Sequence, residues 1–173
     1  MKYLKQYCIP ITELKQEVYS FDFNVNEKFF EQFENSEIKK GNADVNITLT
    51  KNSQNIILTF NIKGSVNVMC DRCLDFFDLP LNIKEKLFFV FSKEKESFSH
   101  DFIVLNINDN KINVAQYIYE FIILNLPIKK NHPNDEFGNS TCNKKMLEKL
   151  SSYTQKKETE IDPRWNKLKN LIK

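Results

Sequence analysis

Apolar and polar residues alternate with a period of two over much of the first two thirds of the chain. Two rows lie on either side of the polar turn 51–54: Ala43, Val45, Ile47 and Leu49, then Ile56, Leu58, Phe60 and Ile62. Similar rows are Tyr19, Phe21 and Phe23, and Leu81, Ile83, Leu87, Phe89 and Phe91, the last interrupted by Glu85. Such alternation predicts strands with one buried face and one face in water. Because short turns join successive strands, we expect antiparallel pairing.

Two segments within this region have helical spacing instead. Asn26 can cap a short helix that carries Phe29, Phe30 and Phe33. The segment 113–126 is apolar on nearly all sides, and Asn113 with Gln116 has the spacing of a capping box. We expect this helix to be buried and to end near Leu126, since Pro127 disfavours helical geometry in the residue before it. A strand is also predicted over 102–107.

The predicted fold class is therefore α+β: an antiparallel, curled or partly closed β-sheet, in a meander, with covering helices and a C-terminal helical tail. We divide the chain into a β-rich core domain at 1–126, a polar His/Cys-containing extension at 127–150, and a tether with a C-terminal helix at 151–173. Asp162 and Pro163 are typical of a helix start. The apolar stripe of that last helix is Trp165, Leu168 and Ile172.

Composition removes several classes of protein. A chain of 173 residues can bury a core without disulfides. No apolar stretch is long enough to span a membrane, and residues 1–7 lack the apolar region of a signal peptide, so we expect a cytoplasmic protein. Only three glycines occur, and neither a dinucleotide-binding fingerprint, a P-loop, HExxH nor GxSxG is present. We therefore do not expect an enzyme.

Charge is distributed unevenly along the chain. Residues 127–173 hold 11 basic and 6 acidic residues, whereas residues 1–126 hold 14 basic and 17 acidic ones. A basic C-terminal part favours contact with nucleic acid, although a solvated lysine-rich helix gives the same pattern. The candidate contacts with RNA or a protein partner are Lys129, Lys130, Lys144, Lys145, Arg164 and Trp165. Of these, Trp165 is better suited to anchor the tail than to stack on bases.

The sharpest chemical motif is Cys70-Asp71-Arg72-Cys73, between two predicted strands. Two thiolates at this spacing can bind one metal ion from a hairpin tip, and His132 and Cys142 are the best candidates for the other two ligands of a structural zinc site. A second interpretation is a set of reduced cysteines in which the motif only turns the hairpin. A redox role is disfavoured, because a thioredoxin-type CxxC lies at a strand-to-helix junction. We interpret Cys8 as a small core residue.

The order of these features resembles the YceD family of large ribosomal RNA subunit accumulation proteins. The resemblance rests on Cys70–Leu74 between strands, the helix ending in Leu126-Pro127, the His/Cys segment after it, and Asp162-Pro163-Arg164-Trp165. It implies support of 23S rRNA synthesis, processing or accumulation without an established enzymatic activity. Many members carry a second cysteine pair after the buried helix, and here His132 and Cys142 occupy those positions.

Two functional hypotheses follow. The first is a non-enzymatic factor for 23S rRNA accumulation and large-subunit assembly, which binds precursor 23S rRNA or a ribosomal or processing protein. In this hypothesis a metal pins the lysine-rich segment to the cysteine hairpin. The second is a protein-interaction adaptor that docks through the last helix and affects RNA only indirectly. A nuclease would need paired carboxylates or a metal with a base, and no convincing spacing for them occurs.

Overall fold

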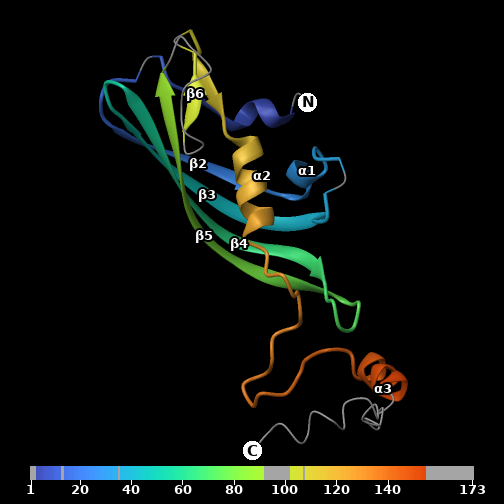
Figure 1. Ribbon diagram of the computed structural model, residues 1–173. Helices are drawn as coiled ribbons and strands as arrows, with labels where there is room; N and C mark the ends of the chain where they lie inside the picture. Colours follow the sequence, from blue (N-terminus) through green and yellow to red (C-terminus); the bar gives the residue numbers. More distant parts are fainter. Residues whose placement is uncertain (1–2, 13, 35, 92–101, 107, 155–173) are drawn as a thin grey trace, which may run out of the picture. The chain divides into compact units, whose positions relative to one another are not determined.

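The computed structural model describes residues 3–12, 14–34, 36–91, 102–106 and 108–154 (Figure 1). The chain divides into two compact units, residues 1–130 and 131–173. The first unit contains the sheets, and the second contains one described helix. The boundary between the units follows Lys130, four residues beyond the end of the predicted core domain.

The predicted α+β class is confirmed. The main sheet has five strands in the order β2-β3-β4-β5-β6 and is open rather than closed into a barrel. The strands are β2 (Val18–Val25), β3 (Lys40–Lys51), β4 (Asn55–Met69), β5 (Phe76–Phe91) and β6 (Ile103–Leu105). From β2 to β5 each strand pairs antiparallel with the next, which is the predicted meander. In Figure 1 the long strands β4 and β5 curve along their length.

The alternating rows form the core as predicted. The eight residues of the two clearest rows, on β3 and β4, are each at most 2% exposed. Each large apolar side chain buried in this way contributes about 1.5–3 kcal/mol to folding. The opposite face carries polar residues, among which Asn46 donates hydrogen bonds to Ser20 and Asp22 on β2. The sheet therefore has one apolar and one polar face.

The expectation of purely antiparallel strands is wrong at one edge, because β6 pairs parallel with β5. The connection from Phe91 to Ile103 has about the dozen residues that a parallel crossover requires. A separate two-stranded antiparallel sheet joins β1 (Cys8–Pro10) to β7 (Lys111–Asn113). Cys8 is half-buried on β1, opposite Asn113.

Helix α2 (Ala115–Leu124) crosses the apolar face of the sheet (Figure 1). The ring of Phe121 packs edge-on to that of Phe60, with ring centroids 5.0 Å apart. The helix is less buried than predicted, since Leu124 is 78% exposed. The predicted capping box is also wrong: the Asn113 side chain accepts from the Ala115 N–H, but the Gln116 amide donates to Glu120, one turn further along.

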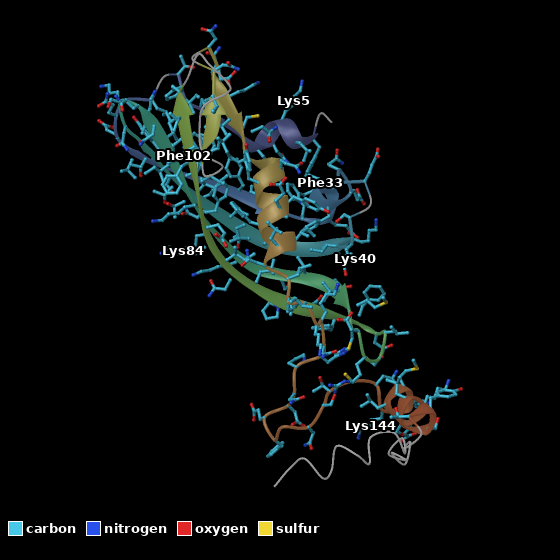
Figure 2. The ribbon with its side chains drawn as sticks, in the orientation of Figure 1. Lys5, Phe33, Lys40, Lys84, Phe102 and Lys144 are labelled. Carbon is cyan, nitrogen blue, oxygen red and sulfur yellow. The ribbon has the colours of Figure 1, made fainter. Side chains whose placement is uncertain are left out.

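Two short helices lie beside α2 in the first unit. The 3-10 helix η1 (Tyr3–Tyr7) precedes β1, and α1 (Glu27–Phe30) follows β2. Asn26 is at the N-cap of α1, as predicted, but its side chain accepts a hydrogen bond from the Tyr3 hydroxyl instead of capping the helix. The ring of Phe33 stacks on that of Tyr119 of α2, with centroids 4.0 Å apart. The labelled Phe33 lies beside α2 in Figure 2.

The second unit contains α3 (Lys144–Tyr153), which was not predicted. Ser151–Tyr153, where the sequence predicts the start of a tether, form the end of this helix. The predicted last helix, with Asp162, Trp165, Leu168 and Ile172, lies outside the described residues. None of the helices in the described ranges is long and apolar enough to cross a membrane.

Candidate metal centre

The turn between β4 and β5 places two cysteines at a hairpin tip, as predicted. Cys70 and Cys73 are buried, at 0% and 1% exposure. The Cys70 N–H donates to the Asp75 carbonyl and the Leu74 N–H donates to the Cys70 carbonyl, both at 2.9 Å. Leu74 has a φ of 63°, a left-handed conformation that is unfavourable for a leucine. This residue lets the chain reverse directly after the second cysteine.

A second tight structure joins His132 to Cys142. The Asp135 carboxylate accepts from the N–H groups of Phe137 and Asn139, at 3.0 and 2.7 Å. These hydrogen bonds, above all that from Asn139, lower the pKa of Asp135. The turn brings the Cys142 sulfur to 3.8 Å from Nδ1 of His132. Cys142 is buried, at 4% exposure.

The four predicted ligands come together as one group. The sulfur atoms of Cys70, Cys73 and Cys142 and a ring nitrogen of His132 all lie within 4.8 Å of one another. All four cysteines are among the described residues, and none of them forms a disulfide.

The geometry and chemistry of this group fit a metal ion. In a tetrahedral zinc site with metal–sulfur bonds of about 2.3 Å and metal–nitrogen bonds of about 2.0–2.1 Å, two sulfurs are about 3.8 Å apart and a sulfur and a nitrogen about 3.6 Å. The separation of 3.8 Å between Cys142 and His132 is close to that value. Three thiolates and an imidazole are soft and borderline ligands, which select zinc over magnesium or calcium. The four residues would close the coordination sphere and leave no position for a catalytic water.

Asp71, inside the cysteine motif, has a role that the sequence did not reveal. Its carboxylate accepts from the Lys130 N–H at 2.7 Å, and its own N–H donates to the Lys130 carbonyl at 2.7 Å. This pair of hydrogen bonds fixes the backbone two residues before His132 in the sequence. The only signal in the sequence was a residue with a short carboxylate side chain between the cysteines, and nothing identified its partner 59 residues away.

The predicted contact lysines differ in their surroundings. Lys129, Lys144 and Lys145 are exposed, and the last two begin α3. Lys130 instead forms an ion pair with Glu37, and its side chain is only 15% exposed. The labelled Lys144 lies on α3 in Figure 2. Arg164 and Trp165 lie outside the described residues.

Comparison with family models identifies the chain. Residues 58–172, about two thirds of the sequence, match the model described as large ribosomal RNA subunit accumulation protein YceD. The protein belongs to the YceD family. The matched range includes the four candidate ligands, α2 and α3. The family's description implies a role in accumulation of the large-subunit ribosomal RNA. No curated protein and no solved structure matched the chain.

Proposed function

We propose that the protein is a non-catalytic, cytoplasmic assembly factor that binds precursor 23S rRNA directly. The observation that carries this proposal is membership of the YceD family, whose description concerns accumulation of the large-subunit ribosomal RNA. Direct binding would protect or order the precursor while the large subunit assembles. A large-subunit ribosomal or processing protein could share the complex.

The lysines after α2 supply the proposed RNA contacts. Lys129, Lys144 and Lys145 are exposed and are therefore accessible to phosphates. Lys144 and Lys145 also lie in the first turn of α3, where the helix dipole adds positive potential. Lys130 contributes less, because Glu37 already neutralises its charge.

Structural zinc would order the segment that carries these lysines. Zinc held by Cys70, Cys73, His132 and Cys142 would act as a cross-link between distant parts of the sequence. A site with four protein ligands supports folding and not hydrolysis. This arrangement supports a structural role for the metal site and is compatible with a binding function for the protein.

Filter binding of a 23S rRNA fragment over a salt series tests direct contact. The logarithm of the affinity should fall linearly with the logarithm of the salt concentration. Replacing both α3 lysines (K144Q/K145Q) should reduce the slope by about 1.4–1.8, since each phosphate that a lysine neutralises adds about 0.7–0.9 to the slope.

The matched control is K84Q/K86Q, which removes the same charge from two exposed lysines on β5. The control should leave the slope nearly unchanged. An affinity that does not depend on salt, or no binding at all, would contradict direct RNA contact.

The alternative function is an adaptor that binds a protein. In favour of it, the predicted last helix, through which the adaptor would dock, carries the apolar stripe Trp165, Leu168 and Ile172. Deleting residues 155–173 separates the two functions, because α3 ends at Tyr153 and stays intact. If this deletion abolishes capture of a ribosomal protein and leaves RNA affinity unchanged, the adaptor is favoured.

A further inference from the structure

An exposed phenylalanine lies on the polar face of the sheet. Along β5 the burial alternates, so that Phe77 faces the core and Phe76 faces outward, with 67% of its surface exposed. Its cross-strand partner is Met69 on β4, which is 47% exposed. The Phe76 ring and the Met69 side chain therefore leave adjoining apolar surface exposed to water, the kind of feature that marks a candidate binding surface.

A small pocket adjoins this ring. Its volume is about 260 Å³, and it is lined by Glu37, Lys39, Lys40, Asn67 and Phe76. Lys40 and Asn67 are opposite each other on β3 and β4, and Phe76 is diagonal to Asn67 across β4 and β5. The pocket lies just below the size of about 300–1,000 Å³ that is typical of sites for drug-sized ligands, so it suits one small planar group.

The charges around the pocket favour an anionic ligand. Glu37 is neutralised by its ion pair with Lys130. Lys40 is 3.9 Å from Glu27, but both side chains are mostly exposed, so this pair is weak. Lys39 forms no ion pair with any residue in the described ranges. Two lysines can therefore bind phosphates beside the ring.

We propose that this pocket binds one unpaired nucleotide of an RNA strand, with its base stacked on Phe76 and its phosphates on Lys39 and Lys40. Proteins that bind single strands combine an aromatic platform with cationic contacts to the backbone in this way. Asn67 offers an amide group to the edge of the base, and its position is fixed by a hydrogen bond to Asp78. The proposal rests on the proposed RNA-binding function and adds a site for unpaired bases to the phosphate contacts of the lysine-rich segment.

The test is fluorescence anisotropy with the full chain and a labelled oligouridylate of about ten nucleotides, a length within the usual range of about 4–16 for such sites. F76A should weaken binding about tenfold or more, since stacking of one base contributes that much. F76Y keeps an aromatic face and should bind as the wild type does. The matched control is F88A, which removes an exposed phenylalanine from the same strand outside the pocket.

Substitution of the two pocket lysines should affect RNA binding differently from substitution of Phe76. K39Q/K40Q should reduce the slope of log affinity against log salt concentration by about 1.4, because each phosphate contact to a single strand contributes about 0.7 to this slope. F76A should weaken binding without changing that slope. A blunt RNA duplex, which has no unstacked base within it, should be insensitive to F76A. Circular dichroism and thermal unfolding should show that all variants fold, since the exchanged side chains are exposed.

The outcomes distinguish this proposal from the proposed function. If wild-type protein binds neither oligouridylate nor a 23S rRNA fragment, the proposed function fails and the pocket with it. If the wild type binds RNA and F76A binds equally well, the pocket proposal alone is overturned. Loss of a protein partner in F76A with unchanged RNA affinity would assign the pocket to a peptide and would also overturn it.

Discussion

The buried cysteines of the hairpin tip differ from Cys8 in a way that a substitution can test. We expect Cys73→Ser to abolish the binding of one zinc ion per chain and to lower the unfolding temperature. A destabilisation of 1 kcal/mol lowers this temperature by about 2–4 °C in a chain of this size, and we expect a larger decrease. Cys8→Ser should retain zinc, because Cys8 lies outside the four-ligand group. Elemental analysis and thermal unfolding are the measurements. Equal zinc content in the two variants would refute the assigned ligands.

Asp71 is expected to act as a positioning residue for the same site. Asp71→Ala removes the acceptor that holds the Lys130 N–H, and removal of such an outer contact typically weakens metal binding about 10–100-fold. Asp71→Asn keeps a side-chain oxygen and should restore most of the affinity. Competition with a chromogenic zinc chelator measures both variants. If the alanine variant binds zinc as tightly as the wild type, the contact has no part in holding the site.

The grouping of the four candidate ligands could be predicted from sequence, and their supporting contacts could not. Cys70 and Cys73 are recognisable because their spacing is itself a geometric constraint on one ion. His132 and Cys142 followed as the remaining suitable side chains after the predicted helix. The partner of Asp71 and the pairing of Lys130 with Glu37 depend on tertiary contacts across 59 and 93 residues, which no local pattern encodes.

Among the elements, β4 depends on a glycine where two strands approach closely. A Cβ atom at Gly64 would lie 2.2 Å from the Asn42 carbonyl oxygen and 2.5 Å from Cα of Ala43 on β3. Gly64→Ala should therefore lower the free energy of unfolding by about 1–3 kcal/mol or more, measured by urea denaturation. Ser65→Ala, at the next position, introduces no such clash and should change it much less. A Gly64→Ala variant as stable as the Ser65→Ala control would show that β3 moves aside.

The turn between His132 and Cys142 should respond to acid. The N–H donors lower the pKa of Asp135. The contribution of its carboxylate to the stability of the turn is therefore complete above the ordinary carboxyl value of 3.8, and it is lost as the pH falls through the lowered pKa. The amide resonances of Phe137 and Asn139 should therefore shift with a midpoint below 3.8. Asp135→Asn should remove this titration. A midpoint at or above the ordinary value would mean that the hydrogen bonds do not stabilise the carboxylate.

Strands and helices could be predicted where the periodicity of one segment alone determines its structure. The rows of β3 and β4 alternate so regularly that only one face can enter the core. By contrast, α3 is mostly polar, with Met146, Leu147, Leu150 and Tyr153 at helical spacing, and its residues fall in the predicted polar extension and the start of the predicted tether. The parallel pairing of β6 depends on the path of the chain between strands, which periodicity does not specify.

For the molecule as a whole, the sequence resemblance and the family match agree. The features that carried the resemblance follow one another over most of the chain, and the family model matches residues 58–172. In the proposed function these features work together: the sheet carries the cysteine turn, and a metal orders the lysine-rich segment for contact with RNA. The binding partner is determined by complementarity between two surfaces, and the periodicity of a single sequence does not encode those surfaces.

The central claim is direct contact with the large-subunit rRNA precursor. Ultraviolet crosslinking of the protein in living cells, followed by sequencing of the attached RNA, tests it most directly. We expect precursor 23S rRNA to be enriched over mature 23S and 16S rRNA, and K144Q/K145Q to reduce the enrichment. Recovery of proteins alone, or of RNA with no preference for the large-subunit precursor, would contradict the claim.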